Sequence, residues 1–227
     1  MFLQTQLNTD SVNNPMVEEK TLSIIELISS GGIGGNIIMG TLALLSIYAI
    51  YILFERYSTI KKASIEDESF LKSIKNFVEQ KDIQAAKTLC RNTDNPVSRM
   101  IERVIDRIDK PMTDISAAIE NQGKLEVYKM ENNLANLATI AGAAPMIGFL
   151  GTVIGMIVAF HEMASAGGNI DVEMLSKGIY TAMVTTVGGL VVGIIAYIAY
   201  NYLVSKIDKV IFQLEARTTE FLDLLHH

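Results

Sequence analysis

Several residue types are scarce in this chain of 227 residues, and each scarcity excludes a class of protein. The only cysteine, Cys90, excludes a disulfide within the chain and cannot build a zinc site alone. A net charge of −6 provides no positive field of the kind that attracts nucleic acid. The sequence also lacks a metal-ligand cluster, an activated nucleophile and a phosphate-binding glycine loop. We therefore expect no nucleic-acid partner, no cofactor or metal, and no enzymatic activity.

Charge is scarce as well, and this scarcity is uneven along the chain. Charged residues make up 19% of the sequence and hydrophobic residues 49%, which is too apolar for an ordinary soluble domain and too charged for an all-membrane one. Three uncharged stretches are each long enough to cross a bilayer as a helix. They are residues 33–54, 138–160 and 178–203. The sequence predicts an all-α membrane protein with three transmembrane helices and long helical extensions outside the membrane.

The remaining segments are polar or amphipathic. Between the first two spans, hydrophobic residues recur at helical spacing, and we interpret the charged residues there as a solvated, balanced surface. A helix starting near Thr113 or Asp114 has no strong stop signal before the second span, so we expect one unbroken helix of about 45 residues, roughly 70 Å long. A short interfacial helix is expected at residues 21–30. The sequence thus divides the chain into seven segments. The three spans are 33–54, 138–160 and 178–203, and the segments outside the hydrocarbon core are the N-terminal segment 1–32, the helical domain 55–137, the connector 161–177 and the C-terminal helix 204–227.

Basic residues are distributed asymmetrically between the two sides of the membrane. Of the 19 Lys and Arg residues, 17 lie in residues 55–137 and 204–227, and the other two lie in residues 1–32 and 161–177. Because cytoplasmic loops carry the excess of Lys and Arg, we expect the first pair of segments in the cytoplasm. The N-terminus is then expected in the periplasm and the C-terminus in the cytoplasm.

Small residues recur along one stripe of each of the last two spans. Steps of three and four residues put such positions on one face of a helix, where two backbones can approach closely. We therefore expect these two spans to pack against one another or against copies of themselves. The residues assigned to helix packing are Ala144, Gly148, Gly151, Gly155, Gly189 and Gly193.

Four threonines in the same spans are candidates for an ion path. Thr152, Thr181, Thr185 and Thr186 carry hydroxyl groups that both donate and accept hydrogen bonds, so they can line a path filled with water. Threonine in an apolar helix also commonly bonds to the carbonyl one turn back on its own helix. The residues themselves leave both interpretations open.

One run of residues is distinctive enough to indicate a family. The sequence APMIGFLGTVIGM at residues 144–156 closely resembles the second-span signature of the ExbB/TolQ/MotA proton-channel family, and the third span is similar at residues 178–180, 185–186 and 189–190. The resemblance implies a homo-oligomeric ring, a pentamer in this branch, in the bacterial inner membrane. The ring would surround the single spans of an ExbD- or TolR-like protein, and proton entry would move a TonB- or TolA-like energy transducer that serves outer-membrane import or envelope integrity.

The resemblance also assigns roles to the threonines and reveals one departure. Thr152 and Thr186 match the ring-lining threonines of the family, but Thr181 stands where many ExbB and TolQ proteins have a glutamate. The last two spans therefore contain no carboxylate. If the ring conducts protons, the partner must supply the acid, which in its family is an aspartate. Otherwise the ion differs or conduction is lost, and a non-conducting structural ring remains the alternative.

Overall fold

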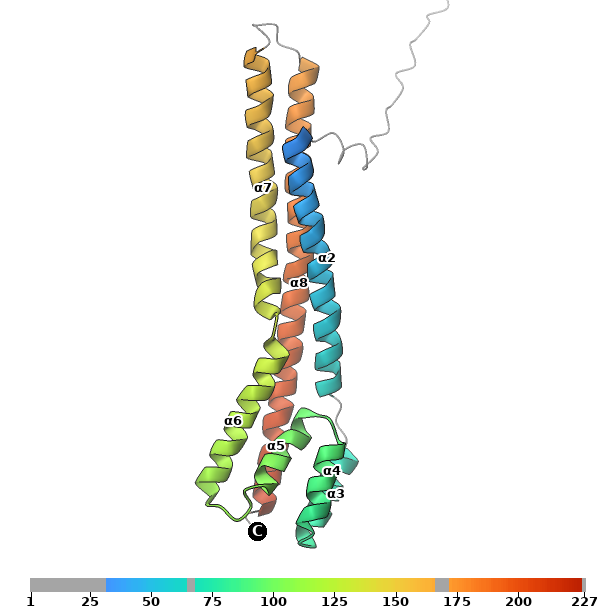
Figure 1. Cartoon of the computed structure of the whole chain (residues 1–227), viewed down its shortest axis with the longest axis vertical. Helices are drawn as coiled ribbons and strands as arrows, with labels where there is room; N and C mark the ends of the chain where they lie inside the picture. Colours follow the sequence, from blue (N-terminus) through green and yellow to red (C-terminus); the bar gives the residue numbers. More distant parts are fainter. Residues whose placement is uncertain (1–31, 65–67, 166–171, 226–227) are drawn as a thin grey trace, which may run out of the picture.

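The computed structural model describes residues 32–64, 68–165 and 172–225, and three long helices dominate it (Figure 1). They are α2 (Gly32–Ala63), α7 (Leu134–Ser165) and α8 (Val172–Leu225). Each is long and apolar enough to cross a membrane, and the described residues contain no strand. The prediction of an all-α membrane protein with three spans is confirmed. The interfacial helix predicted at residues 21–30 lies outside the described residues.

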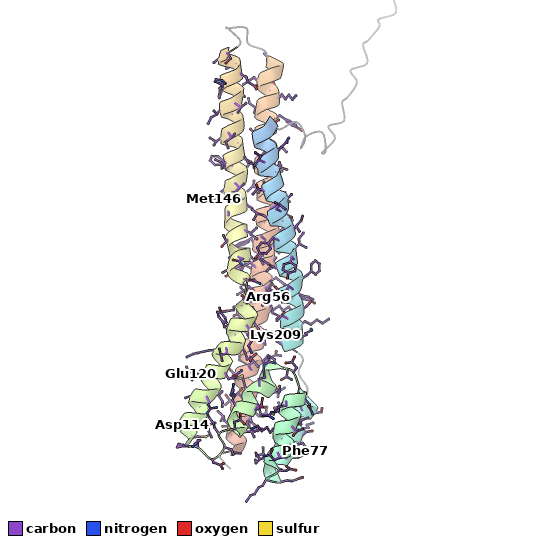
Figure 2. All side chains as sticks on the ribbon, viewed as in Figure 1. Arg56, Phe77, Asp114, Glu120, Met146 and Lys209 are labelled. Atoms are coloured by element: carbon purple, nitrogen blue, oxygen red, sulfur yellow. The ribbon has the colours of Figure 1, made fainter. Side chains whose placement is uncertain are left out.

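These spans are helical for a simple physical reason. Hydrocarbon offers no hydrogen-bonding partner, so a backbone that crosses it must satisfy its own N–H and C=O groups within the helix. The outward faces are correspondingly apolar: Leu44 of α2, Met146 of α7 and Ile194 of α8 are 70%, 73% and 56% exposed. Met146 is labelled in Figure 2. In water such faces would be unfavourable, whereas lipid tails cover them without cost.

Four shorter helices gather beside the lower part of α8 (Figure 1). They are α3 (Glu68–Glu79), α4 (Ile83–Asn92), α5 (Pro96–Ile105) and α6 (Met112–Glu131). Asp82 caps α4 by accepting a hydrogen bond from the Ala85 N–H, and Asn95 forms a capping box with Ser98 at the start of α5. We call these four helices, together with residues 204–225 of α8, the distal bundle. Its core includes Ile74, Ile101 and Val104, all fully buried.

The expected unbroken helix of about 45 residues does not form, so that prediction is wrong. Helix α6 ends at Glu131 and α7 begins at Leu134. Between them Asn133 adopts a left-handed backbone conformation with φ of 64°. Asparagine tolerates this conformation better than most residues because its short amide can bond to nearby backbone. The Asn132-Asn133 pair is thus the physical cause of the break.

The third span and the C-terminal segment form one continuous helix. Helix α8 has 54 residues and is therefore about 80 Å long at 1.5 Å per residue. It contacts α2 and α7 in the membrane part and α5 and α6 in the distal bundle, and its contact with α2 extends as far as Tyr202. A single rod thus joins the membrane spans to the distal bundle.

Candidate ion path between α7 and α8

Helices α7 and α8 pack so closely that only glycine fits at the contact. A Cβ atom added to Gly148 would lie 2.7 Å from the Thr185 carbonyl oxygen and 3.0 Å from the Gly189 Cα. One added to Gly189 would lie 2.8 Å from the Gly148 Cα. The distances of 2.7 and 2.8 Å are shorter than real Cβ contacts, and the blocking atoms are backbone. The two backbones therefore touch at these glycines.

The same register continues along the helix pair. A Cβ added to any of four further glycines would meet the opposite helix. The pairs are Gly178 with Ala159, Gly155 with Ala182, Gly151 with Thr185, and Gly193 with Pro145. Ala144 is fully buried in the same interface, where its carbonyl oxygen approaches Gly189. The structure thus brings all six residues assigned to helix packing into the contact between α7 and α8.

Two of the candidate threonines meet across this interface. The Thr152 and Thr186 hydroxyl groups are hydrogen-bonded to each other. The Thr152 Oγ1 also lies 3.2 Å from the Ala182 carbonyl oxygen, and the Thr186 Oγ1 lies 3.2 Å from the Gly148 carbonyl oxygen. Every one of these partners is on the opposite helix. We call Thr152 and Thr186 the hydroxyl pair.

The proton count of the hydroxyl pair permits two arrangements. Each hydroxyl has one proton to donate. If Thr152 donates to Thr186, then Thr186 donates to the Gly148 carbonyl. If Thr186 donates to Thr152, then Thr152 donates to the Ala182 carbonyl. The same heavy atoms thus support a hydrogen-bonded chain of either polarity, which is the property that one step of a proton relay requires.

Thr185 behaves differently from the hydroxyl pair. It is 2% exposed, and its hydroxyl donates to the Ala182 carbonyl oxygen on its own helix at 2.7 Å. The Gly148 carbonyl oxygen is more distant, at 3.3 Å. Thr185 therefore adopts the local bond of a threonine in an apolar helix and fills the space beside Gly151.

Thr181 lies on another side of α8. Its Cγ2 is 3.6 Å from the position of a Cβ on Gly35, so it faces α2. Five residues separate it from Thr186, which is a rotation of about 140° around the helix. The structure brings Thr152, Thr185 and Thr186 together and leaves Thr181 in the contact between α2 and α8.

The hydroxyl pair borders the surface of the three-helix unit. Thr152 and Thr186 are both half-buried, whereas Thr185 beside them is not accessible. Neighbouring side chains are large, apolar and exposed, such as Phe149 at 63% and Val187 at 59%. Residues 138–160 and 178–203 contain no Asp or Glu, so neither span places a carboxylate beside the pair.

Sequence reasoning missed a buried ionic network in the distal bundle, where it expected only solvated charge. Glu126 is 1% exposed; it receives hydrogen bonds from Arg99 at 2.7 and 3.0 Å, from Gln122 at 2.8 Å and from Lys129 at 2.9 Å. Burial alone would raise the pKa of Glu126, but the hydrogen bonds from Arg99 and Lys129 outweigh it, so the pKa lies below its ordinary value. A signal was present, because Glu126 shares a helical face with Ile115, Ile119 and Met130.

Sequence reasoning also missed a buried arginine at the break between α6 and α7. Arg56, at the end of the first span, is 5% exposed and forms an ion pair with Glu55. Its Nη1 donates a hydrogen bond of 2.9 Å to the Lys129 carbonyl oxygen in the last turn of α6. This carbonyl is one of the groups that a helix end leaves without a partner. Arg56 therefore ties α2 to the end of α6.

Comparisons with known proteins agree with the residue pattern. The profile of the MotA/TolQ/ExbB proton channel family matches residues 92–216, which include the hydroxyl pair. A putative biopolymer transport protein ExbB homolog of Methanothermobacter thermautotrophicus is 29% identical over 194 residues, 85% of this chain and 67% of the relative. A biopolymer transport protein ExbB of Helicobacter pylori is 39% identical over 112 residues, which are 48% of this chain and 71% of the relative. A Tol-Pal system protein TolQ of Pseudomonas aeruginosa is 24% identical over 223 residues, which are 93% of this chain and 96% of the relative.

Proposed function

The chain belongs to the MotA/TolQ/ExbB proton channel family, and from that premise we propose that it is the ring-forming subunit of a proton-driven motor in a bacterial inner membrane. The ring would surround an ExbD- or TolR-like partner with one span and deliver movement to a TonB-like energy transducer. The observation that carries this proposal is the hydroxyl pair, Thr152 with Thr186.

The division of labour follows from the chemistry of the spans. The hydroxyl pair can relay a proton, and Thr181 stands where an acid would bind one, so the carboxylate must come from the partner. Transfer of one elementary charge through 100 mV releases about 2.3 kcal/mol, so a few protons suffice to bias a conformational change. This chain supplies the relay, and the partner supplies the group that changes charge.

Assembly of several copies, a pentamer in this proposal, would complete the path. Lipid tails can cover exposed apolar residues such as Phe149 and Val187, but they cannot hydrogen-bond the hydroxyl pair. Neighbouring copies would cover the apolar flanks and leave the pair facing the partner's span. The pair would then line a shared interior.

The proposal predicts which threonines matter for proton flux. The full chain would be reconstituted in vesicles with the ExbD- or TolR-like protein of the same genome, and proton uptake would be followed with a pH-sensitive dye. T152V and T186V should each lower flux on the order of tenfold, the factor that corresponds to a loss of about 1.4 kcal/mol. T139V is the matched control, because Thr139 of α7 donates to the Ala135 carbonyl of its own helix. Normal flux in both test variants, with assembly intact, would exclude the role given to the hydroxyl pair.

A non-conducting structural ring is the second candidate, and the absence of a carboxylate from the last two spans favours it. The same vesicles separate the two proposals. Proton uptake that requires both the partner and a pH gradient supports the channel, whereas vesicles that hold the assembled complex but take up no protons support the structural ring.

The branch of the family is a further part of the proposal. We propose an ExbB-like role in outer-membrane import; a TolQ-like role in envelope integrity is the alternative, favoured by the alignment over 96% of the Pseudomonas TolQ. Deletion of the gene distinguishes them. An ExbB-like protein is needed for energised uptake across the outer membrane, and a TolQ-like protein is needed to retain periplasmic enzymes.

A further inference from the structure

A positively charged cavity lies far from the hydroxyl pair, between the end of α2 and the middle of α8. Its volume is about 290 Å³, and three lysines line it: Lys61, Lys206 and Lys209. Lys206 is 20 residues beyond Thr186, about 30 Å along α8. No acidic side chain lines the cavity, and none of the three ammonium groups forms an ion pair within the described residues. The lysines therefore leave a positive charge that no protein group in this part of the structure neutralises.

The floor and one wall of the cavity are apolar. Ile60, Leu203 and Val210 line the floor and are 4%, 0% and 2% exposed. Tyr57 forms part of the wall; its ring stacks on Tyr202 at 6.4 Å, and the Lys206 Nζ lies 5.5 Å from the centre of the Tyr202 ring. The aromatic pair thus holds Lys206 beside the cavity. The lysines would attract a free anion electrostatically, but a free anion has no apolar group that could pack on this floor.

The cavity begins where the uncharged spans end. The first span loses its uncharged character after Phe54, and the third after Leu203. The lining residues then continue for seven positions, from Tyr57 to Ser64 and from Leu203 to Val210, about 10 Å along each helix. A bilayer's headgroup layers add about 5–8 Å on each side of its hydrocarbon core. By this measure Lys206, about 5 Å beyond the end of its span, lies within the headgroup layer, and Lys61 and Lys209, about 9–10 Å beyond theirs, lie at its outer edge. Lys209 and the nearby Arg56 are labelled in Figure 2.

We propose that this cavity binds the headgroup of an anionic glycerophospholipid. The three ammonium groups bind its phosphate oxygens, and the Ser64 hydroxyl, which also lines the cavity, is an additional donor. The apolar floor covers the glycerol and the start of an acyl chain. Basic pockets between transmembrane helices are a recurrent form of lipid headgroup site. The proposal does not depend on proton conduction.

The test measures lipid preference in the full chain. Purified protein in detergent would be titrated with phosphatidylglycerol and with phosphatidylcholine of the same acyl chains, and the bound lipid would be counted by native mass spectrometry. Wild type should bind the anionic lipid about tenfold or more tightly than the zwitterionic one, since clustered basic residues at the membrane surface favour anionic headgroups. The variant K61Q/K206Q/K209Q should lose this preference. The control K72Q/K75Q/K81Q removes the same charge from exposed positions of α3 and of the turn that follows it, and this variant should keep the preference.

Further arms keep the result interpretable. The variant K61R/K206R/K209R keeps the three positive charges and should prefer the anionic lipid as wild type does. Loss of the preference in the glutamine variant alone would then be an effect of charge and not of misfolding. Millimolar inorganic phosphate or glycerol 3-phosphate should not displace the lipid, because neither can occupy the apolar floor. Equal binding of the two lipids by wild type, or an unchanged preference in the glutamine variant, would overturn the proposal. Complete displacement by inorganic phosphate would identify a free-anion site and would overturn it as well.

Discussion

A threonine hydroxyl in an apolar helix has two kinds of partner, and the residue opposite it decides between them. Thr139 donates to the Ala135 carbonyl at 2.8 Å on its own helix, as isolated threonines do. Thr152 and Thr186 instead bond across to the other helix, because the glycines beside them let the two backbones come within reach. At the scale of single residues, glycine is thus what makes the hydroxyl pair possible.

The glycine contact can be tested by one added methyl group. G189A should lower the thermal unfolding midpoint of the full chain in detergent, because the new Cβ would lie 2.8 Å from the Gly148 Cα. Relief of this clash requires one of the two helix backbones to shift. Overpacking of this kind costs about 1–3 kcal/mol. G142A is the control: its Cβ would meet nothing within 4 Å, and alanine favours the helix. Equal midpoints for the two variants would contradict the close contact.

At the scale of elements, the ionic network around Glu126 joins α5 to α6, and its stability should depend on pH. The pKa of Glu126 is lower in the folded protein than its reference value of 4.5. Its contribution is therefore present above about pH 4.5 and is lost as the pH falls through the lower folded pKa. The melting midpoint of E126Q should lie well below that of wild type at pH 7, and the difference should narrow below pH 4.5.

The exposed pair on the same helix provides the control for this prediction. Glu120 pairs with Lys124, and both side chains are more than two-thirds exposed, so water screens the interaction. E120Q should therefore leave the midpoint nearly unchanged at every pH. A gap between E126Q and wild type that stays constant from pH 7 to well below pH 4.5 would show that the stabilisation does not depend on the ionised carboxylate. An equal effect of E120Q would show that burial of the network adds no stability.

The elements also show why the sequence predicted the membrane part better than the rest. An uncharged stretch of 22 or more residues has few structures open to it, so the three spans could be located from composition alone. The break at Asn132-Asn133 depends on a single left-handed residue, and Arg56 reaches it from more than 70 residues away. Neither local propensity nor periodicity encodes that contact. The same holds for the hydroxyl pair, whose members lie 34 residues apart.

At the scale of the whole molecule, α8 is the element that couples its parts. One helix of 54 residues carries Thr186 of the hydroxyl pair, two of the three lysines of the proposed lipid cavity, Lys206 and Lys209, and buried residues of the distal bundle such as Leu214. The α6–α7 connection has a break, whereas α8 has none, so a movement at the hydroxyl pair would reach the distal bundle chiefly through α8. Whether this movement would be transmitted toward the cytoplasm or toward the periplasm depends on which side of the membrane the distal bundle occupies.

The orientation proposed from the basic residues places the distal bundle in the cytoplasm, and the single cysteine makes this testable. Burial, with smaller contributions from Glu102 and Asp106, raises the pKa of Cys90 to about 12, so wild type should react little with a maleimide. A membrane-impermeant maleimide added outside spheroplasts should label V172C, at the exposed start of α8, but should label K72C on α3 only after the membrane is permeabilised. The reverse pattern would invert the topology and would place the lysine cavity in the outer leaflet.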